Sequence, residues 1–331
     1  MKALKIVGII LLVMVALFFI IAFFLPSKLH MEESIVINKP ASLIFKQVNN
    51  FHNWPAWSPW EAGDPEMVNT YEGPEQGLDA KNVWKSKKFG DGSMTIIESV
   101  PYKKVSSALD FGQKGTATSY FEFQDEQGGT KVTWGLDIPQ LAYPLDRYFG
   151  LMMPGMMKPF FSDGLKKMKE ITEAMPDPPL LQLMQLPEKA VVSVIDSCSW
   201  ADIGMKMGQL FGELIALQGK AKFEINGAPM SMYHKWDEVK QFTVFENCLP
   251  VDREVAGKGR VQYKVLPATR AVMGTHFGAY DKTMYMYVAM DEFMKDFGLE
   301  QAGGPIEEYI TDPMLEPDTS KWQTNIYFPV K

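Results

Sequence analysis

The most conspicuous apolar run in the chain covers residues 6–25, where no charged or polar side chain occurs. As a helix it is about 30 Å long, which matches the hydrocarbon core of a bilayer. A cleaved secretory signal is the alternative, but its apolar region is usually about 7–15 residues long and ends in small residues. This run ends in Phe23, Phe24 and Leu25. We therefore expect a transmembrane anchor within residues 1–30, with its helix at about 6–25.

Basic residues flank this run unevenly. Lys2, Lys5 and the amino terminus precede it, and Lys28 follows it. Because positive charge is enriched on the cytoplasmic side of membrane spans, we expect a single-pass inner-membrane protein with a cytoplasmic N-terminus. The residues after the anchor would then lie outside the inner membrane.

The pattern changes to alternation after residue 30. Residues 32–38 alternate as in a strand, and Pro40 opens a short helix that carries Ile44 and Val48 on one side. Five further strand-like runs follow, and residues 160–175 repeat apolar side chains at helical spacing. The runs are residues 81–87, 93–100, 105–111, 116–123 and 130–138. This order predicts an α+β domain at 31–175 in which a long helix covers an antiparallel sheet.

Proline then interrupts the chain. Pro176, Pro178, Pro179 and Pro187 lie within residues 176–187, which we interpret as a linker, because proline removes backbone donors and disfavours helix in its predecessor. The linker leaves a second domain at 188–331, and both domains have an ordinary size.

The second domain contains an internal repeat. A strand near Val191, a helix at about 201–217 and two strands ending near Val251 recur about 80 residues later, from Val272 to Val330. The later copy has its helix at about 282–297. Two copies of a strand-helix-strand-strand unit predict a pseudo-twofold α+β domain, because one unit alone cannot cover its own apolar face.

The first domain resembles the START-like, polyketide cyclase/dehydrase superfamily. The resemblance rests on NKPA at 38–41, FHNWPAWSPW at 51–60 and GTKVTW at 129–134. It implies a helix-grip fold, whose relatives hold a hydrophobic cavity between the sheet and the last helix. We expect Trp54, Trp57 and Trp60 to brace the loop at 51–60, called the aromatic loop below, rather than to touch a ligand.

The second domain resembles the GyrI-like family, the effector-binding domain of bacterial multidrug-sensing regulators. The matching segments are HFGAYD at 276–281, PIEEYITDP at 305–313 and TNIYFPV at 324–330. The resemblance implies that Glu307, the glutamate of the Pro-x-Glu-x-Tyr pattern at 305–309, lies in the ligand pocket and, as in multidrug sensors, faces a cationic ligand.

Alternation supports a special place for Glu307. In an extended segment Glu307 and Tyr309 share one face, and Glu308 points to the other. The first repeat has Ser231 at the equivalent position, so the fold itself does not require a carboxylate there. The alternative is a glutamate exposed on an edge strand.

Aromatic residues of the same domain are candidates for the pocket walls, because rings supply large contact areas with few rotors. The alternative for each is simple core packing. The candidates are Tyr309, Tyr233, Trp236, Phe277 and Trp200.

Charge and composition exclude several functions. The chain has 33 basic and 40 acidic side chains, and residues 188–331 alone have 15 and 20, so we expect no nucleic-acid partner. Four scattered histidines, and methionines at helical spacing, give no spaced metal-ligand set, and we expect neither a metal nor a cofactor. Cys198 and Cys248 could pair in an exported domain, but buried free thiols are the better interpretation.

Three functions remain. The leading hypothesis is a membrane-anchored, non-enzymatic protein that binds a small hydrophobic or cationic molecule at Glu307. The second is a hydrolase that uses Glu307 as general base, although the sequence offers no second catalytic group and we assign no catalytic residue. The third is a carrier of lipid or another hydrophobic ligand in the START-like cavity.

Overall fold

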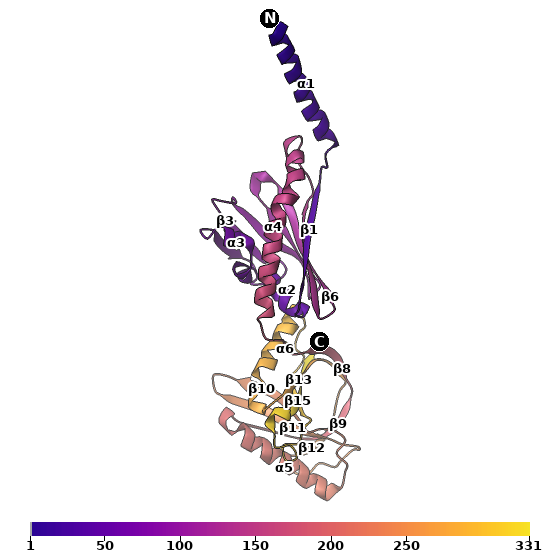
Figure 1. Cartoon of the computed structure of the whole chain (residues 1–331). Coiled ribbons are helices and arrows are strands. Elements are labelled where there is room, and N and C mark those ends of the chain that lie inside the picture. Colours follow the sequence, from indigo (N-terminus) through magenta and orange to yellow (C-terminus); the bar gives the residue numbers. More distant parts are fainter. Residues whose placement is uncertain (1) are drawn as a thin grey trace. The chain divides into compact units, whose positions relative to one another are not determined.

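The structure, a computed structural model, describes residues 2–331 and divides into two compact units, Met1–Asp177 and Pro178–Lys331. Each unit contains its own antiparallel sheet and its own buried core (Figure 1). Helices pack on both sheets, which confirms the α+β class expected from the alternation of apolar residues.

The first unit begins with helix α1 (Lys2–Phe24), which starts earlier than the apolar run that predicts it. The side chains of its Leu4–Phe24 segment are largely exposed. Among residues 2–331, α1 is the one helix long and apolar enough to cross a bilayer, and a signal sequence shares these two properties.

A seven-stranded antiparallel sheet follows, in the spatial order β1-β7-β6-β5-β4-β3-β2. Its strands are β1 (Leu29–Ile37), β2 (Val68–Glu72), β3 (Lys81–Lys85), β4 (Gly92–Val100), β5 (Lys104–Asp110), β6 (Thr116–Glu126) and β7 (Gly129–Ile138). Between β1 and β2 lie α2 (Ala41–Asn49), the 3₁₀ helix η1 (Phe51–Ala56) and α3 (Pro59–Gly63), and η2 (Gly112–Lys114) precedes β6.

The last helix of this unit, α4 (Leu145–Glu173), is longer than the helix predicted at 160–175. Pro154 and Pro159 lie inside it, where each removes one backbone donor without ending the helix. The buried residues of its C-terminal half, Phe161, Leu165 and Met168, pack in the core of the unit. This arrangement is the helix grip expected from the sequence.

Aromatic rings fill much of the space beneath α4. The Trp134 ring stacks on Phe161 at 4.3 Å between centroids and on Phe121 at 5.0 Å. Trp54 and Trp57 are buried against the same rings, and their indole N–H groups donate to carbonyl oxygens near the end of α2 at 3.0 and 3.1 Å. These contacts agree with the bracing role predicted for these two tryptophans, and whether they also touch a ligand stays a prediction.

The second unit forms an eight-stranded antiparallel sheet in the order β12-β9-β11-β10-β14-β15-β13-β8. Its strands are β8 (Leu181–Leu186), β9 (Lys189–Ser199), β10 (Met230–Asp237), β11 (Phe242–Pro250), β12 (Gln262–Leu266), β13 (Thr269–Phe277), β14 (Ile306–Tyr309) and β15 (Gln323–Val330). Its helices are α5 (Ile203–Ala221) and α6 (Met284–Asp296), with the 3₁₀ helices η3 (Trp200–Asp202), η4 (Tyr280–Lys282) and η5 (Thr319–Lys321).

The strand order displays the predicted repeat. The first copy consists of β9, α5, β10 and β11, and the second consists of β13, α6, β14 and β15. The two copies meet where β10 pairs with β14, and Ser231 lies directly opposite Glu307 in that register. The pseudo-twofold relation therefore brings together the two residues that the repeat made equivalent.

Part of the proline-rich segment at 176–187 is a strand. Residues Leu181–Leu186 form β8 and pair with β13 at the edge of the sheet. The prolines lie on either side of this strand, so none of them removes a hydrogen bond from its pairing with β13.

Candidate functional site

Glu307 is a buried carboxylate in the middle of the second sheet. It lies on the short strand β14, between β10 and β15, and its exposed fraction is only 7%. Side-chain alternation puts Glu307 and Tyr309 on one face of the strand and Glu308 on the other. A short inner strand with neighbours on both sides explains why this glutamate is not on the surface.

Three tyrosine hydroxyls surround the carboxylate. Tyr309 and Tyr233 donate to its Oε2 at 2.8 and 3.1 Å, and Tyr287 donates to its Oε1 at 2.8 Å. Within the described part of the chain, Glu307 forms these hydrogen bonds and no ion pair with a lysine or arginine. Its partners among the described residues are therefore hydroxyl groups.

The surroundings keep these phenols protonated. Burial, followed by the proximity of the Glu307 carboxylate, raises the pKa of Tyr233, Tyr287 and Tyr309 far above the usual value. Each ring therefore retains the O–H that it donates to Glu307 throughout the neutral pH range.

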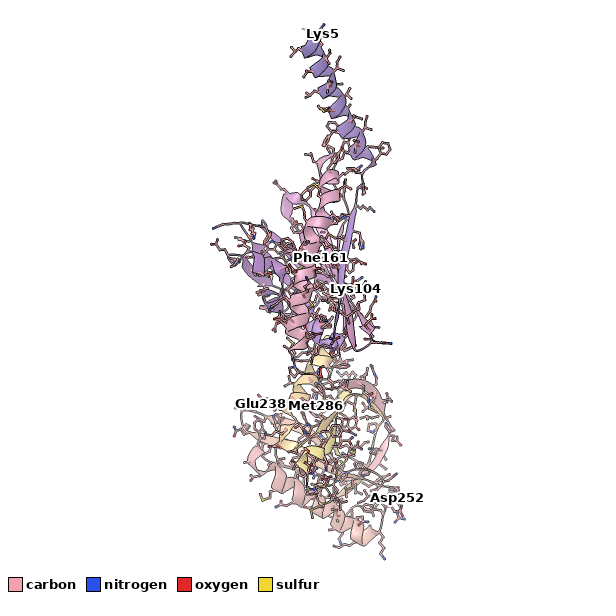
Figure 2. All side chains as sticks on the ribbon, in the orientation of Figure 1. Lys5, Lys104, Phe161, Glu238, Asp252 and Met286 are labelled. Atoms are coloured by element: carbon pink, nitrogen blue, oxygen red, sulfur yellow. The ribbon has the colours of Figure 1, made fainter. Side chains whose placement is uncertain are left out.

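The three tyrosines come from three elements. Tyr233 lies on β10, Tyr309 on β14 and Tyr287 on α6, which packs on β13. Met286, labelled in Figure 2, is fully buried on the same helix and anchors it against the sheet. The site thus depends on the docking of α6 as well as on strand register.

Sequence reasoning missed Tyr287. It follows Met286 by one position and precedes Met290 by three, so helical spacing puts it at the edge of the stripe marked by the methionines. That spacing was the available signal, but the sequence does not give the position of α6 over the sheet.

A second layer of rings lies behind Tyr309 and was also missed. Phe211 of α5 meets Tyr309 edge-on at 6.2 Å, and Tyr280 meets it at 5.2 Å. Trp322 packs on Tyr280 at 4.8 Å. The carboxylate is therefore enclosed by aromatic side chains that originate far apart in the sequence.

Of the other predicted wall residues, two lie next to the three tyrosines around Glu307 and one does not. Trp200 and Trp236 stack at 4.6 Å, and Trp236 meets Tyr233 edge-on at 6.2 Å while remaining 47% exposed. Phe277 is 62% exposed and is not brought to Glu307. The side chain of its neighbour His276 is the one that turns inward from β13.

Two other carboxylates of this domain, the partly buried Glu308 and the buried Glu246, are paired with cations. Glu308 accepts from Lys189 at 2.9 Å and from Tyr327 at 2.8 Å. Burial acts to raise the pKa of Glu308, but these hydrogen bonds dominate and hold it below the usual value. Glu246 likewise accepts from Lys264 at 2.6 Å and His234 at 2.9 Å. Glu307 differs from both because no cation of residues 2–331 pairs with it.

The cysteines are free and buried, as predicted. Cys198 lies on β9 and Cys248 on β11, and burial raises the pKa of Cys248 to about 12. The thiols are therefore packing groups. Within residues 2–331, no group of three or more His, Cys, Asp or Glu side chains could hold a metal ion.

In the first unit, a groove of about 480 Å³ lies between the aromatic loop and α4. Its walls include Pro55, Pro59 and Phe160, and Asp163 and Lys167 also line it. It contains no buried charge comparable with Glu307.

Family comparisons agree with these two architectures. A model described as polyketide cyclase / dehydrase and lipid transport matches residues 28–173, and a model described as GyrI-like small molecule binding domain matches residues 181–331. The chain carries both domains, in this order. The GyrI-like domain is accordingly a small-molecule-binding domain, and Glu307 lies within it.

Several solved structures are similar to the chain. The C-terminal domain of EcmrR has 24% identity and a TM-score of 0.42, covering 46% of this chain and 98% of that one. A complex of EcmrR with DNA has 22% identity and a TM-score of 0.44, covering 56% and 70%. A hydrolase from Listeria innocua has 14% identity and a TM-score of 0.37, covering 49% and 98%. Comparison with curated proteins gives no match.

Proposed function

We propose that this protein is a membrane-anchored, non-enzymatic receptor for hydrophobic organic cations. The GyrI-like domain binds the cation at Glu307, within the aromatic cluster of Tyr233, Tyr287 and Tyr309. The stacked pair Trp200 and Trp236 forms the outer wall of the site, next to Tyr233.

The observation that carries this proposal is the state of the Glu307 carboxylate. It is almost fully buried, and its partners are three hydroxyl groups and no cation among the described residues. A buried anion of this kind gains most from a cation that brings little hydration of its own. An organic cation with apolar substituents meets that description.

The surrounding rings favour the same class of ligand. The faces of aromatic rings attract a cation within about 6 Å of the ring centroid, and the attraction strengthens when water is excluded. The net charge of −5 in residues 188–331 adds a weaker, longer-range preference for cations.

Binding is better supported than catalysis at this site. A general base must reach a substrate proton or a water molecule with a free lone pair. Tyrosines already occupy three of the roughly four acceptor positions of the Glu307 carboxylate, which leaves one on Oε1. The lipid-carrier alternative is also less supported, because the buried rings of Trp54, Trp57 and Trp134, which meet edge-on or tilted, occupy much of the interior of the first domain.

Helix α1 supplies the anchor in this proposal. Its apolar segment is long enough to span a bilayer, and Lys2 and Lys5 at its start favour a cytoplasmic N-terminus. Both domains would then lie on the outer side of the inner membrane.

Titration of the full chain in detergent with tetraphenylphosphonium, followed by intrinsic fluorescence, tests the cation site. We expect Glu307→Gln to weaken binding by about 2 kcal/mol or more, roughly 30-fold, because the variant removes the charge that pairs with the ligand. Glu308→Gln is the matched control, since Glu308 is adjacent, partly buried and on the opposite face, and the variant should bind like wild type.

Equal affinity of wild type and Glu307→Gln would contradict the proposed site. Turnover of an ester or lactone panel by wild type, lost in Glu307→Gln, would replace the receptor with the hydrolase.

A further inference from the structure

The first turns of α4 carry an exposed apolar stripe. Leu145, Phe149, Met152 and Met156 recur at spacings of four, three and four residues, which puts them on one side of the helix. Their exposed fractions lie between 48% and 68%. On another side of the helix Gly150 is buried, so the stripe is not the face that packs on the domain.

This end of α4 is attached to the last turns of α1. The hydroxyl of Tyr148 donates to the carbonyl oxygen of Phe18 at 2.7 Å, and that of Tyr143 donates to Phe19 at 2.8 Å. The Tyr148 ring also stacks on the Phe18 ring at 4.7 Å. Figure 1 shows the start of α4 next to the end of α1 that leads into β1.

Arg147 strengthens the attachment. Its guanidinium donates at 3.1 Å to the carbonyl oxygens of Ala22 and Phe23, which belong to the last turn of α1. Carbonyls in a last helical turn lack partners within the helix and carry partial negative charge, so a cation caps them well.

These contacts determine how deep α4 lies when α1 spans a bilayer. Phe18 precedes the end of α1 at Phe24 by six residues, or about 9 Å along the axis. A bilayer edge at Phe18 would leave residues 4–18, about 22 Å of helix, to cross a core of about 30 Å. The edge therefore lies beyond Phe18, and the Tyr148 ring is below it.

We propose that the stripe of Leu145, Phe149, Met152 and Met156 is a second membrane-contacting surface, immersed in the phospholipid interface beside the anchor. The inference rests on the proposed anchoring by α1. Amphipathic helices bury their apolar faces about 5–10 Å into the boundary between headgroups and acyl chains, which is the depth required here.

The polar groups at this end of α4 suit that environment. The two tyrosine hydroxyls donate to carbonyls of α1 and so need no water. Tyrosine and arginine are also typical of membrane–water interfaces. Asp146 and Lys158 lie outside the stripe on the helix surface, where headgroups and water can solvate them.

Depth-dependent fluorescence quenching tests this inference on the full chain. Single substitutions Leu145→Cys, Lys166→Cys and Leu12→Cys accept an environment-sensitive label, and unsubstituted protein gives the background from the buried native cysteines. Lys166 is the matched control, since it lies on the same helix with the same 68% exposure as Leu145. Leu12, in the middle of α1, reports on the anchor.

The labelled proteins are placed in vesicles of phosphatidylcholine and phosphatidylglycerol that contain lipids with a nitroxide near the headgroup. We expect the label at 145 to lose most of its emission and to be blue-shifted relative to the label at 166. With a nitroxide near the chain end instead, the label at 12 should be quenched more than the label at 145.

Quenching at 12 with an unquenched, water-like label at 145 would overturn this inference and leave the anchor intact. Absence of quenching at all three positions would overturn the anchor and this inference together. Disulfide formation between two copies at 145, without quenching by lipid, would assign the stripe to a second copy of the chain and overturn the membrane contact.

Discussion

Glu307 and Glu308 are neighbours in the chain but have opposite environments. Glu308 is paired with Lys189, whereas Glu307 meets only hydroxyl groups among the described residues. An ion pair satisfies a buried carboxylate with the protein's own cation and leaves little for a ligand to contribute. Hydroxyl donors satisfy the geometry of the oxygen atoms and leave the charge unbalanced, which is why Glu307 is the candidate for recognition.

Tyr287→Phe tests the importance of one of these donors. The change removes the one described donor to Oε1 of Glu307 and leaves that buried oxygen unpaired. A loss of one partner of a buried polar group costs about 1–3 kcal/mol. We expect the backbone amides of β14 in the full chain to exchange hydrogen faster, by the factor that corresponds to this loss of about 1–3 kcal/mol.

Tyr285→Phe serves as its control. Tyr285 lies on the same helix but is half-exposed, and its hydroxyl contacts His276 rather than Glu307. Equal effects of the two substitutions on β14 would show that helix α6, and not the hydrogen bond to Glu307, determines the stability of the site.

Of the four central residues of this candidate site, the sequence predicted Glu307, Tyr233 and Tyr309 but not Tyr287. Alternation correctly put Glu307 and Tyr309 on one face, because strand periodicity is local. Tyr287, Tyr280 and Trp322 were not predicted as neighbours, because their proximity depends on how distant segments pack over the sheet. Phe277 was predicted as a wall residue but does not reach Glu307, because its position on β13 turns its side chain outward.

At the level of elements, the pairing of β10 with β14 builds the centre of the site. The internal repeat predicted two equivalent units, and the structure joins them so that Ser231 faces Glu307 across the pair. The long helix α4 was predicted only in its C-terminal half, and the edge strand β2 was not predicted. Prolines obscured the first half of α4, and β2 is a short edge strand without a buried side chain.

A network of charges connects three elements of the GyrI-like domain and provides a pH test. Arg260, in the loop before β12, donates to Asp196 of β9 and to Glu213 of α5. The hydrogen bond from Arg260 is the main cause that lowers the pKa of Asp196 to about 2, and it also lowers the pKa of Glu213.

A carboxyl with a lowered folded-state pKa stabilises the fold above its unfolded pKa and loses this contribution as the pH falls through the folded value. Arg260→Ala should therefore destabilise the domain by about 1 kcal/mol at neutral pH, a small value because Arg260 is nearly half exposed. The difference from wild type should shrink as the pH falls from about 4 to 2.

Scanning calorimetry of the full chain over this pH range measures the effect. Arg253→Ala is the control, because Arg253 donates to the carbonyl oxygen of Lys222, a group that does not titrate. A pH-independent difference for Arg260→Ala would show that its loss acts through packing and not through the two carboxylates.

At the scale of the whole molecule, the apolar helix, the aromatic-filled domain and the GyrI-like domain are distinct parts of one chain. Their order was predictable because each part has its own sequence pattern. Helix α1 is a continuous apolar run, the first domain shows the alternation of strands, and the GyrI-like domain adds an internal repeat of about 80 residues. The chemistry of the ligand was less predictable, since it depends on contacts within one of these parts.

Alkaline carbonate extraction of membranes containing the full chain tests the anchor. We expect the protein to remain in the membrane fraction with residues 1–25 present in its intact mass, because α1 has the length and apolarity of a span. A chain that starts at residue 28 should be released. An intact mass that lacks the apolar run would identify α1 as a cleaved signal instead.

Charge selectivity at Glu307 is the most direct measurement. Methyltriphenylphosphonium and the neutral triphenylphosphine oxide have the same three phenyl rings on phosphorus, with a methyl group in the cation where the oxide has its oxygen. Calorimetric titration of wild type and Glu307→Gln with both therefore separates the effect of charge from that of aromatic bulk. We predict that wild type binds the cation at least about tenfold more tightly than the neutral compound, a difference of about 1.4 kcal/mol, and that Glu307→Gln abolishes this preference. An equal preference in both proteins would contradict recognition of cations by Glu307.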